Sequence, residues 1–461
     1  MSTAMPAANW VITGDIVTMD AHRTIITEGA VAVVGNKIAA VGKAHNIRAQ
    51  YRGVPELGSA QSLVLPGFIN AHQHLTADRL IASAIPDNLA ASSAIFDWVL
   101  PVHNHVSGDD DELAATLSLT EAAANGITTT IEAGTVAHPD RVAKAMNTVG
   151  VRGAIGGWGS DADGLPQSAS VSEVIDIQRQ LIERYSSGGL VEASVTLVGH
   201  NLMSDDLVVE AANLARATQT RLSFHLSPTP DDSNYYLERT GCRPLVHLDR
   251  LGVLGSNVLV GHAVHVDTAE LETLVRTNTA VVSCPWAYLR LGQGVTKCFA
   301  HLDLWHQGGR VALGCDTENA GDAVDALRAA ALFCGLAKDT AQDPTQFGAH
   351  HALELLTIAG AEAVGMADRI GSLEVGKMAD IVVIDRSGIG WLPPSPDPIL
   401  QLLWANGSRS VSDVLVDGNL VIKDGNCLTV DTESLREPAR QAAQQLVERS
   451  GIRPSSRWPM H

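Results

Sequence analysis

The sequence has few of the features that mark exported or membrane-bound proteins. Its six cysteines form no CxxC pair, and a chain of 461 residues does not need a disulfide framework. The N-terminus has no basic segment followed by an apolar run, so no signal peptide is expected. No stretch reaches the roughly 18 apolar residues that a membrane span requires. These absences predict a cytoplasmic protein with reduced thiols and no membrane partner.

Basic residues are also scarce. Lys and Arg number 32 against 51 Asp and Glu, which gives a net charge of −19 at pH 7. Such a surface argues against nucleic acid or an anionic membrane as a partner. Aromatic residues make up only 4% of the chain, whereas 45% is hydrophobic and 41 residues are glycine. This composition is typical of an α/β enzyme, and we expect its partner to be a small-molecule substrate.

Several catalytic motifs are missing. No GxSxG sequence is present, which disfavours a serine hydrolase built on a nucleophile elbow. No HExxH sequence is present, which disfavours a zincin. No PCxxC sequence is present, which disfavours the zinc deaminases that act on nucleic acids.

The order of the predicted elements indicates the fold class. Residues 10–42 and 380–422 read as short strands without helices between them, whereas residues 66–370 alternate short apolar runs with helical segments. This pattern predicts an α/β fold, namely a distorted (β/α)8 TIM barrel with a small β-sandwich domain built from both chain ends. The expected parts are the N-terminal part of the β-domain, the barrel, the C-terminal part of the β-domain and a C-terminal helix or tail, at residues 1–65, 66–370, 371–430 and 431–461.

Polar residues follow apolar runs at the points where barrel strands should end. His72 and His74 end the first run; residues i and i+2 of a strand point the same way, so both imidazoles can reach one metal. His225, His262 and Asp316 end three later runs. Barrels of this kind place their active sites at the carboxyl ends of the strands. The combination therefore predicts a metal site.

A second pair with the same spacing, His103 and His105, follows Pro101 and lies outside a convincing strand. We interpret this pair as surface residues rather than as metal ligands.

These motifs and their flanks resemble the amidohydrolase superfamily, in particular the branch of chlorohydrolases and aminohydrolases. That branch contains guanine, cytosine and adenosine-type deaminases, triazine hydrolases, and enzymes that cleave phenylurea and thiocarbamate herbicides. The resemblance covers nearly the whole chain. It is carried by PGFINAHQH at 66–74, Gly261-His262, Ser283-Cys284-Pro285 with Leu291-Gly292, Gly314-Cys315-Asp316, and GSLEVGK at 371–377 with Ala379-Asp380.

The resemblance implies a set of metal ligands and two catalytic residues, one of which is also a ligand. It assigns the metal to His72, His74, His225 and Asp316, with His262 and Asp316 as the catalytic residues. Two-metal members of the superfamily usually carry a carboxylated lysine on the fourth strand, and the expected fourth strand here, residues 193–198, has no lysine. We therefore expect one divalent metal ion per subunit, with zinc as the first choice and iron, cobalt or manganese as alternatives.

One position departs from the pattern. Relatives that act on heteroaromatic rings usually carry Glu three residues after the third metal histidine, where it transfers a proton to a ring nitrogen; here that position is Pro228. Attack on an acyl carbon has less need of such a group. The sequence thus favours hydrolysis of a C–N bond in an uncharged amide, urea or carbamate. The alternative is deamination or dechlorination of an N-heteroaromatic ring, with a water or one of two expected loop residues, Asp231 and Asp232, as proton donor.

Six further residues are expected to contact the substrate. His200 matches a substrate-contacting histidine of the relatives, and Trp98 lies where their first long loop approaches the pocket. Trp286 and Tyr288 follow the Cys-Pro dipeptide and suit an apolar or aryl group, although Trp286 can equally pack against a helix. Glu318 and Asn319 share the loop of Asp316, where capping of the next helix is the alternative. The resemblance also implies a homodimer or a higher homo-oligomer.

Overall fold

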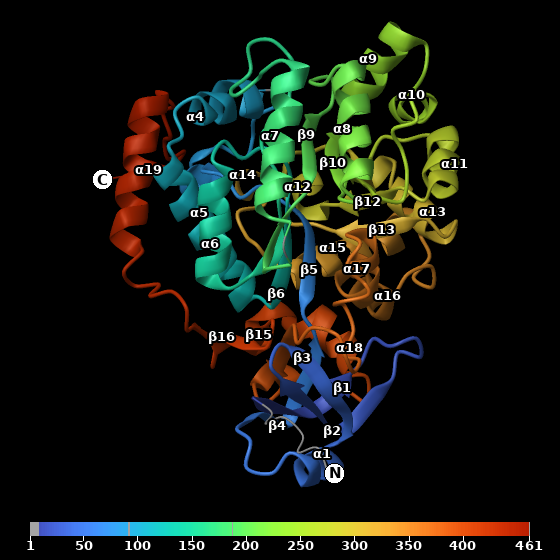
Figure 1. Ribbon diagram of the computed structural model, residues 1–461, viewed down its shortest axis with the longest axis vertical. Coiled ribbons are helices and arrows are strands. Elements are labelled where there is room, and N and C mark those ends of the chain that lie inside the picture. Colours follow the sequence, from blue (N-terminus) through green and yellow to red (C-terminus); the bar gives the residue numbers. More distant parts are fainter. Residues whose placement is uncertain (1–8, 91–92, 187, 461) are drawn as a thin grey trace.

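The computed structural model describes residues 9–90, 93–186 and 188–460. An upper body, in which helices surround parallel strands, stands on a lower sheet that lies beside the N-terminus (Figure 1). Among the described residues, no helix is long and apolar enough to cross a membrane.

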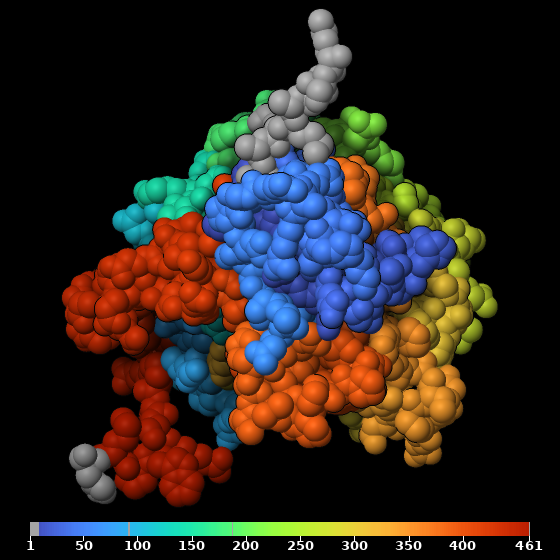
Figure 2. All heavy atoms as spheres, turned by 90° about the horizontal axis from the view of Figure 1, so that it is seen from below, coloured from blue at the N-terminus to red at the C-terminus, as the bar shows by residue number. Residues whose placement is uncertain are grey.

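Strands from both chain ends form one eight-stranded sheet in the order β17-β16-β15-β14-β4-β1-β2-β3, as predicted for the two ends. Only β1 and β4 pair in parallel, and the other neighbours are antiparallel. Seen from below, the N-terminal strands and helix α1 (Ala44–Gln50) lie beside segments of residues 380–430 (Figure 2). The strands are β1 (Trp10–Val17), β2 (Ile25–Val34), β3 (Lys37–Lys43), β4 (Glu56–Pro66), β14 (Ile381–Asp385), β15 (Val411–Val416), β16 (Asn419–Lys423) and β17 (Asn426–Cys427).

The middle of the chain forms two parallel sheets, β5-β6-β7-β8 and β9-β10-β11-β12-β13. Ser194 alone separates β8 from β9, and a bridge between Gln73 and Asp316 brings the end of the last strand back to the first. The strands therefore make a barrel-like ring that closes beside the predicted metal site. They are β5 (Phe68–Gln73), β6 (Ile127–Glu132), β7 (Arg152–Ile155), β8 (Val191–Ala193), β9 (Val195–Gly199), β10 (Leu222–Leu226), β11 (Val258–His262), β12 (Ala280–Ser283) and β13 (Arg310–Leu313).

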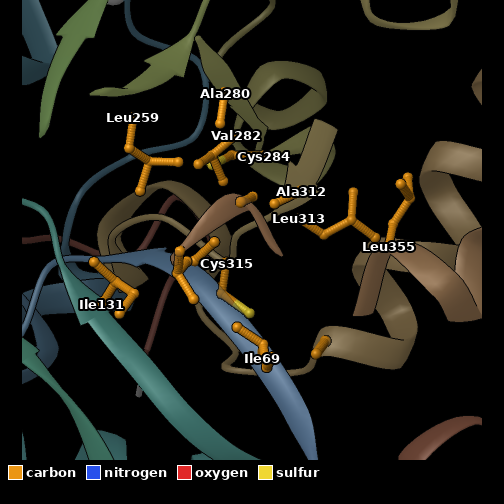
Figure 3. Packing of buried hydrophobic residues seen from close by; sticks show 14 of the residues in the cluster. Ile69, Ile131, Leu259, Ala280, Val282, Cys284, Ala312, Leu313, Cys315 and Leu355 are labelled. Atoms are coloured by element: carbon orange, nitrogen blue, oxygen red, sulfur yellow. The ribbon is translucent and has the colours of Figure 1, made fainter. Parts of the chain in front are cut away.

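The strands of the ring are almost entirely buried, which explains apolar runs such as those of β11 and β12. Figure 3 shows buried side chains of several strands gathered in one cluster, among them Ile69 of β5, Leu259 of β11, Val282 of β12 and Leu313 of β13. This packed interior holds the strand ends, and with them the polar side chains that follow, in fixed positions.

Helices surround the ring (Figure 1). Ser204 caps α8, because its side chain accepts a hydrogen bond from the backbone N of Leu207. The main helices are α5 (Gly108–Ala124), α6 (Pro139–Val149), α7 (Val171–Arg184), α8 (Asp205–Ala217), α9 (Pro230–Thr240), α10 (Pro244–Arg250), α11 (Thr268–Thr277), α12 (Pro285–Arg290), α13 (Ala300–His306), α14 (Glu318–Gly321), α15 (Ala326–Ala341), α16 (Ala349–Leu356) and α17 (Ile358–Ala363).

The C-terminal helix α19 (Arg436–Ser450) lies at the side of the barrel next to α4 (Leu100–His103) and α5 (Figure 1). Its Leu446 joins a small apolar cluster with Ile81 and Val102, and Arg449 forms an ion pair with Asp110 at 2.6 Å. Shorter turns complete the chain: α2 (Asp78–Ile81), α18 (Pro398–Gln401), η1 (Ala82–Ala84), η2 (Ala94–Val99), η3 (Val295–Lys297), η4 (Ile389–Trp391), η5 (Leu402–Asn406) and η6 (Gly407–Ser410).

Candidate active site

Four predicted imidazoles converge at the carboxyl ends of the strands. His72 is the last residue but one of β5, and His74 directly follows that strand. His225 lies in β10, and His262 ends β11. The Nε2 atoms of His74 and His225 are 3.1 Å apart. The ring of His72 lies 4.7 Å from that of His225 and 5.2 Å from that of His262, measured between centroids.

Asp316 completes the cluster from the loop after β13. Its Oδ1 lies 3.3 Å from Nε2 of His74 and 3.8 Å from Nε2 of His72, and its Oδ2 lies 3.9 Å from Nδ1 of His262. Burial raises the pKa of Asp316, but the hydrogen bond with His74 and the neighbouring imidazoles outweigh burial and lower it well below its usual range. The carboxylate is therefore ionised in the site.

The donor set fits a divalent metal ion. Among the described residues, Nε2 of His72 and Nδ1 of His262 have no hydrogen-bond partner although they are buried. Such atoms require an explanation, because burial without a partner is costly. Ligand atoms of His72, His225 and His262 lie within 4.8 Å of one another. Burial lowers the pKa of all three, to about 4 for His262, which favours the neutral imidazole that binds metals. Nitrogen donors with one carboxylate suit zinc.

A cysteine that sequence reasoning did not select also borders the cluster. Cys284 can group with His72 and Asp316 within the same 4.8 Å limit. Burial raises the pKa of its thiol well above the usual value, so that the thiolate needed for metal binding is disfavoured. The histidines are the better ligands.

Outer contacts orient two of the imidazoles. Nδ1 of His74 lies 2.5 Å from Oγ1 of Thr135, and Nδ1 of His225 lies 2.7 Å from the carbonyl oxygen of Val198. Both contacts leave Nε2 turned toward the cluster, as ligands to a metal require. Glu132, at the end of β6, accepts hydrogen bonds from the backbone of the loop that carries Thr135. Sequence reasoning missed Glu132, because the strand that it ends contains three threonines and does not read as an apolar run.

Two glycines make room for His72. A Cβ at Gly261 would lie 2.8 Å from Cε1 of His72, and a Cβ at Gly314 would lie 2.7 Å from its Cβ. Only glycine lets the neighbouring backbones approach the ring this closely. This close packing explains why glycine occupies the first position of the Gly261-His262 and Gly314-Cys315-Asp316 sequences.

The backbone of the site is strained. His200, His262 and Asp316 have φ values of 54°, 76° and 64°, in the left-handed region that residues other than glycine rarely adopt. Ser227, after β10, and Ala263, after β11, also have positive φ values, of 52° and 49°. Strain of this kind clusters at functional sites, where the surrounding structure maintains it.

The residues that follow Pro228 are not in a loop, which corrects the prediction. Asp231 and Asp232 lie in the first turn of α9. Asp231 is exposed and pairs with Thr229, whereas Asp232 is buried and its Oδ2 lies 2.9 Å from Nδ1 of His200. Burial raises the pKa of Asp232, but the charge and hydrogen bond of His200 lower it below the usual value overall. Of the two carboxylates, only Asp232 faces the cluster.

The predicted aromatic contacts have other partners. Tyr288 is fully buried behind His262, with ring centroids 5.7 Å apart, and its hydroxyl accepts a hydrogen bond from the backbone N of Cys284. Trp286 lies under the guanidinium of Arg328, 3.4 Å from the ring centroid. Trp286 thus contacts α15 through Arg328, and Tyr288 lies against His262. Contact of either ring with a substrate stays a prediction.

Glu318 and Asn319 are buried beside Asp316, in α14. Glu318 accepts a hydrogen bond from Ser118 of α5, so one of its oxygens is turned toward the helix layer. Its other oxygen and Nδ2 of Asn319 have no hydrogen-bond partner. Burial raises the pKa of Glu318 to about 7.

Two remaining predictions concern the segment before α5. Trp98 packs on the apolar cluster of Ile81 and Leu446, and no contact joins it to the described metal cluster. His103 is buried and lies 3.0 Å from the carboxylate of Asp78, so its prediction as a surface residue was wrong. Its partner His105 is exposed, as predicted.

Comparison with known proteins agrees with this geometry. Residues 63–421 match the Amidohydrolase family. The chain belongs to the amidohydrolase family. Curated relatives include a 5-methylthioadenosine/S-adenosylhomocysteine deaminase of Syntrophobacter fumaroxidans, 29% identical over 94% of this chain and 97% of that protein. A 5'-deoxyadenosine deaminase of Methanobrevibacter smithii is 27% identical over 92% of this chain and 95% of that protein.

Solved structures show the same fold. An adenosine deaminase from Xanthomonas campestris with bound zinc has a TM-score of 0.91 at 25% identity and covers 96% of this chain and 100% of its own. The atrazine chlorohydrolase of Arthrobacter aurescens, complexed with zinc, has a TM-score of 0.85 at 23% identity and covers 94% of this chain and 100% of its own. This chain is a metal-dependent amidohydrolase, and its relatives favour the deaminase alternative over cleavage of ureas or carbamates.

Proposed function

We propose that the protein is a zinc-dependent deaminase that replaces the amino group of an N-heteroaromatic ring, with adenine nucleosides as the first substrates to test. The observation that carries this proposal is the similarity, along nearly the whole chain, to curated deaminases whose named substrates all contain an adenine ring. The cluster of His72, His74, His225 and Asp316 supplies the donor set that such chemistry needs.

Each group of the cluster has a role in this proposal. The three histidines and Asp316 hold the metal, which when bound supplies a Lewis acid and lowers the pKa of water. Asp316 is ionised and lies among the imidazoles, so it can accept the proton of the attacking water. His262 turns its unpartnered Nδ1 toward Asp316 and can stabilise charge that develops at the attacked carbon.

Cleavage of an amide, urea or carbamate is the second candidate function. Pro228 favours it, because the chain lacks the carboxylate that ring-acting relatives usually place there. The buried carboxylate of Asp232 weakens this argument, since it lies beside His200 at the edge of the same cluster.

We also propose the finer description of the fold, a distorted (β/α)8 barrel with a β-sandwich domain. A closed ring of strands and a single sheet shared by both chain ends support it. The homo-oligomer and the cytoplasmic location stay predictions.

A substrate panel tests the function. Zinc-loaded protein is incubated with adenosine, 5'-deoxyadenosine, 5'-methylthioadenosine, S-adenosylhomocysteine, cytosine, guanine, a chlorotriazine, N-aryl ureas and carbamates. Ammonia is measured, and products are identified by mass spectrometry. We expect ammonia and the 6-oxo product from at least one adenine nucleoside, with kcat/KM of about 10⁴ M⁻¹s⁻¹ or more. Amine release from the ureas or carbamates alone would establish the second candidate instead.

A further inference from the structure

His200 has two different environments at its two ring nitrogens. Nδ1 lies 2.9 Å from the carboxylate of Asp232. Nε2 has no hydrogen-bond partner among the described residues, and 26% of the side chain is exposed. The imidazole is therefore held at one nitrogen and open at the other.

The open nitrogen belongs to a ring that stands beside the candidate metal ligands. The ring of His200 stacks on that of His225 at 5.6 Å and lies nearly parallel to that of His262 at 6.5 Å. The partly exposed side chain of His200 therefore lies beside the candidate metal ligands, where it can contact a molecule bound next to them.

Helix α9 holds His200 from two sides. Asp232 is itself fixed, because its Oδ2 also accepts a hydrogen bond from the backbone N of Ser227 at 2.6 Å. One turn later, the hydroxyl of Tyr236 donates to the carbonyl oxygen of His200 at 3.2 Å. A carboxylate whose position is determined in this way can determine the tautomer of its imidazole partner.

We infer that Asp232 is a positioning residue that holds His200 as the Nδ1–H tautomer, so that Nε2 accepts a hydrogen bond from an N–H or O–H group of the substrate. The identity of that substrate rests on the proposed function, whereas the tautomer does not. At this side of the site the chain presents an imidazole lone pair, which selects ligands that carry a donor there. This role differs from that of the Glu that ring-acting relatives usually carry at the position of Pro228, because that Glu transfers a proton.

The tautomer is tested first, without any substrate. Zinc-loaded protein with ¹⁵N-labelled histidine is studied by NMR, and the His200→Gln variant identifies the signals of His200. We expect a protonated Nδ1 and an unprotonated Nε2 in the wild type, and loss of this preference in Asp232→Asn, whose amide can donate to Nδ1. Asp231→Asn removes the same charge one residue away and is expected to leave the signals unchanged. A protonated Nε2 in the wild type, or an unchanged pattern in Asp232→Asn, would overturn the inference.

The contact with substrate is tested by kinetics on the compound that the wild type turns over fastest in the substrate panel. We expect Asp232→Asn to lower kcat/KM by about 10- to 100-fold, mainly through KM, because a binding contact is misdirected. His200→Leu is expected to lose at least as much, and His200→Gln, whose side-chain oxygen can accept, to recover part of the loss. Asp231→Asn is the matched control.

A double mutant decides whether Asp232 acts through His200. We expect Asp232→Asn to have no further effect when His200 is already Leu, because the group that it orients is gone. The same loss in both backgrounds would refute the positioning role. If the panel shows turnover of ureas or carbamates only, the proposed function fails. The NMR measurement of the tautomer and the double-mutant kinetics still test this inference in that case.

Discussion

The metal-binding cluster at the carboxyl ends of the parallel strands and the buried cation Arg152 at their amino ends differ in how their polar groups are paired. At the carboxyl ends, buried nitrogens of His72 and His262 lack partners, and the backbone at His262 and Asp316 is strained. At the amino ends, where the ring meets the lower sheet, a buried charge is fully paired. The difference shows which end keeps groups free for a ligand and which end secures the fold, as in other barrels.

The paired charge is Arg152, at the start of β7. Its Nε lies 2.7 Å from Asp380, just before β14, and its Nη2 lies 2.8 Å from Asp417, in the turn before β16. Asp380 also accepts a hydrogen bond from the backbone N of Asp417. Although burial lowers the pKa of Arg152, the two carboxylates raise it overall. This network joins the ring to the sheet made from the C-terminal part of the chain.

The largest effect is expected at the carboxyl ends. His72→Asn removes a ligand nitrogen, so bound zinc should fall well below one ion per chain and turnover by on the order of a thousandfold or more. Zinc is measured by mass spectrometry of the purified protein, and turnover on the best substrate of the panel. Full zinc content in this variant would remove His72 from the ligand set. Arg152→Met, at the other end, should keep its zinc when folded.

The opposite effect is expected at the amino ends. Arg152→Met leaves Asp380 buried without its cation, and breaking a buried pair in this way costs about 3–5 kcal/mol of unfolding free energy. Thermal or denaturant unfolding measures the loss, and the folded fraction should keep its specific activity. Arg440→Met, which removes an exposed pair of α19 with Glu437, is the control and should change little. Equal stability of the two variants would contradict the contrast between the ends.

The metal cluster could be predicted from the sequence because its signal is local. Each ligand follows an apolar run, and the fold class implies that such strand ends meet at one place. The alternation of strands and helices likewise predicted the parallel sheets, and the strands at both chain ends predicted the shared sheet.

The surroundings of the cluster could not be predicted, because they depend on contacts between distant segments. His103 is buried because Asp78, 25 residues away, accepts its hydrogen bond. Asp232 faces the cluster because α9 begins at Pro230 rather than after the two aspartates. The choice of substrate is harder still, since the absence of Glu at position 228 favoured acyl chemistry, whereas the curated relatives are deaminases.

The smallest effect is expected at Glu318, which lies at the carboxyl ends of the strands. One of its carboxylate oxygens has no hydrogen-bond partner among the described residues. Burial raises its pKa from 4.5 to about 7, so between these pH values the folded protein binds a proton that the unfolded chain has released. The unfolding free energy therefore falls as the pH rises through this window, by at most about 3 kcal/mol. Glu318→Gln cannot ionise and keeps an acceptor for Ser118. The melting temperature of this variant, relative to that of the wild type, should be higher at pH 8 than at pH 5. The exposed Glu238→Gln is the control and should show no such trend. If the difference in melting temperature between Glu318→Gln and the wild type is the same at both pH values, Glu318 stays ionised in the folded protein.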